Sequence, residues 1–164
     1  KDSKVIFWSL SGEKLQQFQT SQDGIFSINF SPDGERLVTA GTDTTVRLWN
    51  LFGKQLAKFN THQGGVVSVS FSPDGQRLVT AGQDGTAKLL LLSGLQISQF
   101  KGHQGRIYSA SFSPDGKYVA TAGKDGVVRL WQVEGLDELL QRGCNWLKDY
   151  FTKHPQVYEV QECG

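Results

Sequence analysis

The sequence contains no methionine, only two cysteines and four prolines, and almost no excess of charge of either sign. Its formal net charge is +1, from 17 basic and 16 acidic residues among 164, and neither sign is gathered in blocks. Such a balance lacks the basic stripe expected of a nucleic-acid binder or of a protein that docks on anionic membranes. No apolar run approaches the length of about 18 residues that suggests a membrane-spanning helix. We therefore expect neither nucleic acid nor a membrane among its partners.

The scarcity of cysteine excludes further classes of protein. Cys144 and Cys163 both lie near the C-terminus, so we expect free thiols in a reducing, cytoplasmic compartment and not a disulfide framework. Two cysteines and three scattered histidines do not have the spacing of a closed zinc site. The glycines follow neither the phosphate-loop nor the dinucleotide-binding spacing. We expect no metal and no cofactor, and the lack of methionine even at position 1 favours a piece of a longer protein.

What the sequence does have is one pattern written three times, with copies 41 residues apart. The copies are NFSPDGERLVTAGTDTTVRLW at 29–49, SFSPDGQRLVTAGQDGTAKLL at 70–90 and SFSPDGKYVATAGKDGVVRLW at 111–131. The same interval aligns the tryptophans at 8, 49 and 131, with Leu90 where one is missing. Repetition at an interval of this length indicates copies of one supersecondary unit, which bury their apolar faces only by stacking.

Each copy predicts short strands joined by tight turns. Ser-Pro-Asp-Gly has turn chemistry, because proline presets φ at one position and glycine supplies a positive φ two residues later. Around it lie β-rich runs such as RLVTAG and TVRLW, with turns at intervals of about 8 to 12 residues. In GRIYSASF (105–112), strict alternation would place Ile107 and Ser109 on one face of a strand, and Tyr108 and Ala110 on the other. We expect four antiparallel strands per copy and an all-β fold, with no helical stripe before residue 135.

With Gly-His before the first strand and tryptophan closing the third, these copies resemble the WD40 repeat of β-propellers. The resemblance spans residues 1–135 and implies a partial β-propeller of four-stranded antiparallel blades. These would be a partial blade at 1–20, blades at about 25–60 and 66–100, and a three-stranded blade at 106–131. Propellers typically close with about four to eight blades, so a longer chain would supply the rest, which we favour. Otherwise a second copy closes the ring as a homo-oligomer, or the chain closes on itself as a small three-blade body.

In that family a buried polar relay of His, Ser or Thr, Asp and Trp stabilises each blade. The last copy has the full set, which is His103, Thr121, Asp125 and Trp131. The middle copy has His62, Thr80 and Asp84, but Leu90 replaces the tryptophan. The first copy has Thr39, Asp43 and Trp49, with Ser21 in place of the histidine. We expect a weaker relay in these two copies. We also expect Asp84 to keep another partner, since an unpartnered buried polar group costs about 1–3 kcal/mol.

After residue 135 the repeat gives way to a tail, 136–164, that begins with an amphipathic helix. LDELLQRGCNWLKDYFTKHP places apolar residues at helical spacing, acidic residues in the first turn and basic residues at the end. We expect this helix to cap the open edge or the base of the blades. The tail also resembles the end of the WD-repeat region of large bacterial, especially cyanobacterial, signalling proteins. Those proteins place a NACHT- or STAND-type nucleotide-binding switch upstream, so the resemblance implies that this chain is a C-terminal sensor.

The repetition argues against an enzyme. His62 and His103 are the same position of two copies, and Asp43, Asp84 and Asp125 likewise recur, so each set shares one environment. General acid–base chemistry needs two groups in different environments. We expect a non-catalytic scaffold for protein–protein interaction, with a carbohydrate or other small ligand bound between blades as the alternative. The candidate contacts, on loops that vary between copies, are Arg106, Tyr108, Phe26, Val67, Lys124, Gln83 and Thr42. Arginine and tyrosine lead this set because both are enriched at interaction hot spots.

Overall fold

A computed structural model describes residues 3–133 of the chain. The chain divides into two compact units, Lys1–Gln132 and Val133–Gly164, and the thirteen strands of the described residues all lie in the first. The helix predicted at the start of the tail, 136–164, lies outside the described residues. None of residues 3–133 belongs to a helix that is long and apolar enough to cross a membrane.

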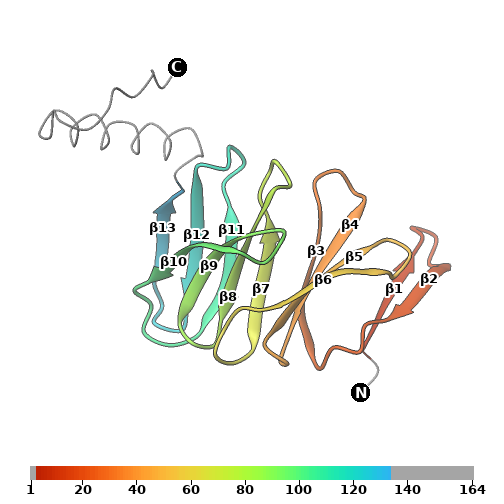
Figure 1. The fold of residues 1–164 in the computed structure, drawn as a ribbon, viewed down its shortest axis with the longest axis horizontal. Helices are drawn as coiled ribbons and strands as arrows, with labels where there is room; N and C mark the ends of the chain where they lie inside the picture. Colours follow the sequence, from red (N-terminus) through yellow and green to blue (C-terminus); the bar gives the residue numbers. More distant parts are fainter. Residues whose placement is uncertain (1–2, 134–164) are drawn as a thin grey trace, which may run out of the picture. The chain divides into compact units, whose positions relative to one another are not determined.

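The strands form four antiparallel sheets in chain order, without a crossover inside any sheet (Figure 1). Sheet A consists of β1 (Lys4–Trp8) and β2 (Lys14–Gln19). Sheet B consists of β3 (Ile25–Phe30), β4 (Arg36–Gly41), β5 (Thr45–Asn50) and β6 (Gln55–Asn60). Sheet C consists of β7 (Val66–Phe71), β8 (Arg77–Gly82), β9 (Thr86–Leu91) and β10 (Gln96–Lys101). Sheet D consists of β11 (Ile107–Phe112), β12 (Tyr118–Gly123) and β13 (Val128–Gln132). The all-β prediction with four-stranded antiparallel sheets is therefore confirmed.

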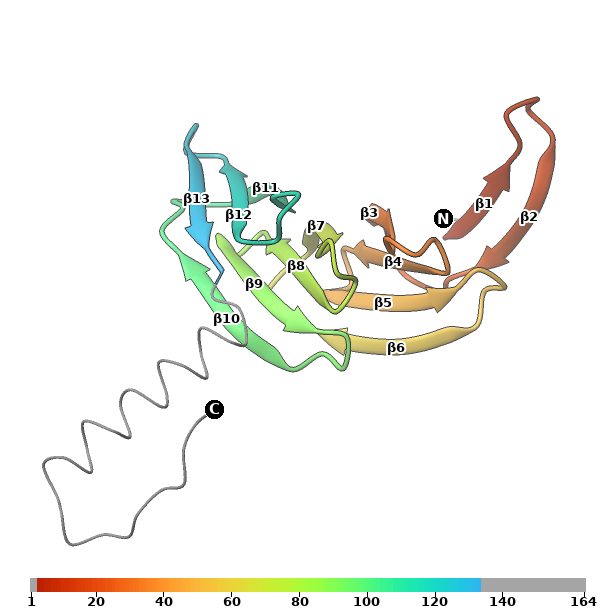
Figure 2. The ribbon, with the colours of Figure 1, turned by 90° about the horizontal axis from the view of Figure 1, so that it is seen from above.

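Sheets B, C and D are neighbours through their first strands, since β3 contacts β7 and β7 contacts β11 (Figure 2). A hydrophobic core fills the space between sheets B and C. Its buried members are Val38, Ala40, Val46 and Leu48 from sheet B, and Val66, Val69, Phe71, Leu78 and Leu90 from sheet C. Polar bonds repeat at the same interfaces: Ser27 Oγ accepts from the Val69 amide (3.2 Å), and Ser68 Oγ accepts from the Ala110 amide (3.3 Å). Sheet B thus buries an apolar face against sheet C, the next copy of the repeat.

The Ser-Pro-Asp-Gly segments form the predicted turns. In the first copy the Gly34 amide donates to the Ser31 carbonyl (2.9 Å), and Gly34 has φ = 71°, which an L side chain rarely adopts. The Asp33 carboxylate accepts from the Ser31 hydroxyl and from the Glu35 amide, and these bonds lower the pKa of Asp33 to about 2. The same glycine-to-serine bond closes the turns at 72–75 and 113–116. Each turn therefore supplies its own partners and needs none from the neighbouring sheet.

The strict alternation predicted for 105–112 is wrong at the start of the strand. The pairing of β11 with β12 skips Tyr108 between Ile107 and Ser109, which is a β-bulge. Because of this extra residue, Ile107 and Ala110 are both buried although they stand three positions apart. The same bulge recurs at Phe26 in β3 and at Val67 in β7. The bulge takes these three positions out of the regular pairing, and two of them, Phe26 and Tyr108, are exposed aromatic residues.

Candidate functional site

In sheet D the four side chains predicted for the polar relay lie in one chain of hydrogen bonds. The indole N–H of Trp131 donates to Thr121 Oγ1 (2.9 Å), and the Thr121 hydroxyl is 2.8 Å from His103 Nε2. On the other side of the ring, His103 Nδ1 is 2.9 Å from Asp125 Oδ1 and 2.8 Å from Arg129 Nη1. Arg129 adds an ion pair to Asp125 (2.8 Å). The relay connects the loop before β11 with β12, the following turn and β13.

The Asp125 carboxylate stays ionised within this relay. Burial opposes its ionisation, but bonds from His103, the Gln104 amide and Arg129 outweigh burial and hold the pKa of Asp125 below its ordinary value. The carboxylate is saturated with partners: Oδ1 contacts His103 Nδ1 and accepts from the Val127 amide, and Oδ2 accepts from the Gln104 amide and from Arg129. Such a group is suited to fixing loops in place, and its lone pairs are already committed.

In sheet C the relay is shorter. His62 lies between Asp84 (3.0 Å from Nδ1) and Thr80 (2.9 Å from Nε2), while Leu90 is buried where tryptophan would donate to the threonine. Asp84 has the further partners expected for it, in the backbone amide and hydroxyl of Thr86 and the amide of Gln63. Burial lowers the pKa of His62 despite the neighbouring carboxylate, so the ring is neutral at pH 7.

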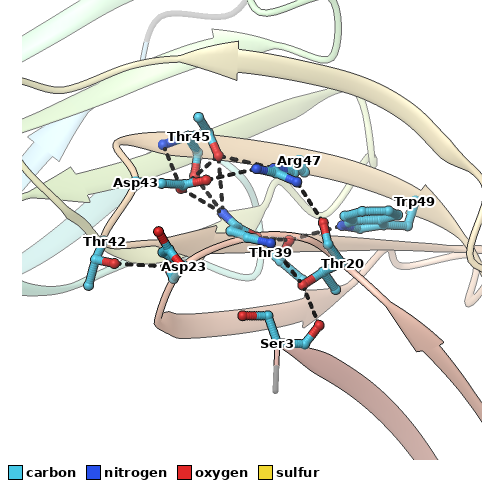
Figure 3. Close-up of polar contacts among 10 residues, drawn as sticks. Ser3, Thr20, Asp23, Thr39, Thr42, Asp43, Thr45, Arg47 and Trp49 are labelled. Carbon is cyan, nitrogen blue, oxygen red and sulfur yellow. Dashed lines mark hydrogen bonds and ion pairs between the residues drawn. The ribbon is translucent and has the colours of Figure 1, made fainter. Parts of the chain in front are cut away.

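Sheet B has a complete relay through a residue that sequence reasoning missed. Figure 3 shows five residues of this part of sheet B, which are Trp49, Thr39, Asp43, Thr45 and Arg47, with dashed lines for the bonds. The Trp49 indole donates to Thr39 Oγ1 (2.9 Å), and the Thr39 hydroxyl donates to Gln22 Oε1 (2.6 Å). The Gln22 amide then donates to the Thr45 carbonyl (2.9 Å) and, more weakly, to Asp43 (3.4 Å). Fully buried Gln22 therefore does what histidine does in the other two sheets.

The replacement depends on a shift of one residue along the chain. Ser21 aligns with the two histidines but is exposed and has φ = 51°, an unusual backbone conformation for serine. The next residue, Gln22, then points into the sheet. Its counterparts Gln63 and Gln104 are exposed and contribute backbone amides to the aspartates. Because all three copies have glutamine at this position, the sequence alone did not indicate that only Gln22 would be buried.

These relays do not converge on a common cleft. Each belongs to one sheet, and each carboxylate or imidazole in it is bonded within its own copy. Across residues 3–133, no group of three His, Cys, Asp or Glu side chains is placed to hold a metal ion. The arrangement can fix turns and strands in position.

The predicted contact residues lie where two loops of each copy meet. The Gln83 amide donates to the Gly65 carbonyl (3.0 Å), and the Lys124 amide donates to the Arg106 carbonyl (2.8 Å). The Thr42 amide likewise bonds to the loop before β3. The structure places Thr42, Gln83 and Lys124 in three separate copies, each against its own loop.

Three other predicted residues come together across two sheet boundaries. The guanidinium carbon of Arg106 lies 5.3 Å from the centre of the Phe26 ring and 5.7 Å from that of Tyr108. Phe26 belongs to sheet B and Tyr108 to sheet D, and their side chains are 46% and 52% exposed. Val67, the equivalent residue of the intervening sheet C, is smaller and half-buried. The sequence identified all three residues of this cluster without predicting that they touch.

Comparison with known proteins gives two findings. A model of the WD domain, G-beta repeat, matches three segments of the chain, residues 12–50, 53–89 and 94–132. A stretch of 47 residues is 49% identical to "Protein groucho" of Drosophila melanogaster and covers 28% of this chain. The chain corresponds to only 6% of the length of that relative. Since the three repeat matches together cover more than half of the sequence, the protein belongs to the WD40-repeat family.

Proposed function

We propose that the chain is a non-catalytic interaction module that binds another protein through the cluster of Arg106, Phe26 and Tyr108. One contrast supports the proposal. The polar side chains of the relays are satisfied inside their own sheets, whereas the two aromatic rings of this cluster are about half exposed. Exposed aromatic side chains beside an arginine have the composition of interaction hot spots. Proteins with WD40 repeats generally mediate protein–protein interaction, which agrees with this contrast.

We further propose that sheet D packs against another sheet of the same kind. Val128 and Leu130 are 68% and 71% exposed, although their counterparts in sheet B, Val46 and Leu48, are 0% and 5% exposed. The counterparts are covered by the next sheet, so the apolar face of sheet D has the shape and composition to be covered in the same way. The neighbour would belong to further repeats of a longer chain, which we favour, or to a second copy that closes a ring.

The setting we propose is cytoplasmic signalling. The resemblance of the tail to bacterial WD-repeat signalling proteins supports a role as the C-terminal sensor of a larger protein. In that role, capture of a partner by the repeats would release an upstream NACHT- or STAND-type nucleotide switch. Sequencing upstream of Lys1 tests this part of the proposal. Further repeats preceded by a phosphate-binding loop are expected, and their absence from the complete gene would contradict it.

Selection from a random library of twelve-residue displayed peptides tests the binding function directly. The full chain is the bait, and the selected peptides are measured by fluorescence anisotropy. We expect Tyr108→Ser to weaken binding at least tenfold. Phe52→Ser is the matched control, because Phe52 is an exposed aromatic residue in the turn at the other end of the strands, and it should leave binding unchanged.

Two results would contradict the proposal. Failure to enrich any peptide that depends on Tyr108 would remove the proposed surface. A glycan array that shows saturable sugar binding, without peptide binding, would favour the alternative of a carbohydrate between the sheets. An aromatic side chain at the same position of every copy would support carbohydrate binding. The residues at that position are Phe26, Val67 and Tyr108, so the middle copy lacks the aromatic ring.

A further inference from the structure

Among residues 3–133, Arg106 differs from the other arginines in having no carboxylate partner. Among residues 3–133 there are five arginines, and four of them form ion pairs with an aspartate three or four positions earlier. These pairs are Arg36–Asp33, Arg47–Asp43, Arg77–Asp74 and Arg129–Asp125. Arg106 forms no ion pair with any described residue, and its Nε is buried without a hydrogen-bond acceptor. A guanidinium that carries five N–H donors is thus left, within the described part of the chain, without the anion that it is best suited to bind.

The position of Arg106 is nevertheless well defined by the two aromatic rings. Its side chain leaves the loop before β11 and lies against Phe26, which belongs to a sheet two copies earlier. The corresponding residue of the intervening copy is Gly65, and a Cβ there would come within 3.4 Å of the Phe26 ring. The absence of a side chain at position 65 therefore leaves room for the arginine beside that ring.

The bulges contribute the two rings. Phe26 and Tyr108 are the unpaired residues of equivalent bulges in β3 and β11. A bulge redirects the side chain of its extra residue, and bulges are frequent beside functional sites. Cation–π contact with both rings holds the guanidinium in place, and because Nε is buried, the edge formed by the two terminal nitrogens is the one left for hydrogen bonding. An arginine held in this way is preorganised for a planar anion, because little side-chain freedom remains to be lost on binding.

The charged residues near Arg106 include a second cation. Lys124 is on the loop whose amide bonds to the Arg106 carbonyl, so a second cation lies in the same part of sheet D. Asp23 is the acidic residue of the corresponding loop in sheet B, and it is not the ion-pair partner of any of the five described arginines. The end of sheet D therefore offers positive charge next to exposed aromatic surface.

We propose that the cluster of Phe26, Arg106 and Tyr108 recognises a carboxylate side chain in an acidic peptide segment of the partner protein. The carboxylate would accept two parallel N–H bonds from one edge of the guanidinium, which is the geometry that arginine favours. Apolar residues beside the acidic residue would pack on the exposed parts of the two rings. This inference rests on the proposed interaction function and adds the chemistry of the partner to it.

The test uses the peptides selected on the full chain. We expect Asp or Glu to be enriched at one fixed position among them. Replacing that residue by Asn or Gln should weaken binding by about tenfold, which corresponds to about 1.4 kcal/mol. Arg106→Ala should weaken binding of the acidic peptide by a similar factor and have little effect on binding of the peptide with Asn or Gln at that position. If the two changes together cost no more than either one alone, the lost affinity belongs to the contact between the arginine and the carboxylate.

A matched arginine controls for a loss of structure. Arg77 also lies against an aromatic ring of the next sheet, with its guanidinium carbon 5.9 Å from the centre of Phe112, but it is paired with Asp74. Arg77→Ala should leave peptide affinity unchanged. Arg106→Lys, which keeps the charge and loses the two parallel donors, should recover only part of the affinity. Urea unfolding of each variant shows whether the fold is retained.

The outcomes separate this inference from the proposed function. If Tyr108-dependent peptides are selected without any acidic preference, the carboxylate proposal is overturned and the interaction function stands. If Arg106→Ala weakens the acidic and amide peptides equally, the arginine only holds the two rings together, and the proposal is again wrong. A phosphoserine peptide that binds tenfold more tightly than the glutamate peptide would replace carboxylate by phosphate as the ligand. If no Tyr108-dependent peptide is obtained, both proposals fail.

Discussion

Removing the side chain of Gln22 is the most direct perturbation of the relay in sheet B. Gln22 is fully buried, accepts from Thr39 at 2.6 Å and donates to the Thr45 carbonyl at 2.9 Å. Each of these two bonds contributes about 0.5–1.5 kcal/mol, and Gln22→Ala also leaves the buried Thr39 hydroxyl without its acceptor. We therefore expect Gln22→Ala to lower the free energy of unfolding by about 2–4 kcal/mol.

The repeat provides matched controls for this prediction. Gln63 and Gln104 occupy the same position in the other two copies, where histidine makes the contacts and the glutamine side chains are exposed. Gln63→Ala and Gln104→Ala should change stability by no more than about 0.5 kcal/mol. Urea unfolding of the full chain, followed by tryptophan fluorescence and circular dichroism, measures all three variants. If Gln22→Ala costs no more than the controls, the reasoning that assigns Gln22 to the relay is refuted.

Three further predictions concern the relays. Thr39→Val should cost about 2 kcal/mol and Thr80→Val about 1 kcal/mol in urea unfolding, because Thr39 bonds on both sides and Thr80 on one; equal costs would contradict this. The folded pKa of His62 lies below the ordinary 6.5, so the unfolded chain takes up a proton that the folded chain resists, and stability is lost as pH falls below about 6.5. In His62→Gln the urea midpoint of unfolding should depend less on pH between pH 7.5 and 5.5. If the midpoint still falls as steeply with pH as in the original protein, another group is responsible. A Cβ at position 82 would lie 2.4 Å from His62 Nδ1, so Gly82→Ala should destabilise the fold by about 2 kcal/mol, and by clearly less when combined with His62→Ala.

Local chemistry explains what the sequence could predict. The Ser-Pro-Asp-Gly turn depends on bonds within six residues, from Ser31 to Arg36, and it forms as expected. The positions of His103, Thr121 and Asp125 followed from a resemblance whose spacing the repeat preserves, and the structure brings these residues together. Both kinds of inference need only the order of residues along the chain.

What the sequence could not predict depends on backbone geometry and on the stacking of sheets. Gln22 enters the relay because Ser21 adopts a positive φ, and the sequence carried no glycine there to signal it. The bulge at Tyr108 adds one residue to a strand that otherwise alternates, so a pattern of period two fails at that point. The contact of Arg106 with Phe26 joins residues 80 positions apart and requires knowing that sheet C lies between their sheets.

The equal spacing of the serine bonds between sheets has a consequence for how such a gene can change. Ser27 accepts from Val69 and Ser68 accepts from Ala110, so each bond spans 42 residues and the second bond repeats the first 41 residues further along the chain. Loss of one 41-codon unit by unequal recombination would bring Ser27 opposite Ala110, which is the pairing that the surviving sheets already use. A unit can therefore be gained or lost without loss of the serine bonds between sheets, whereas the contact of Arg106 with Phe26 depends on the copy that lies between them.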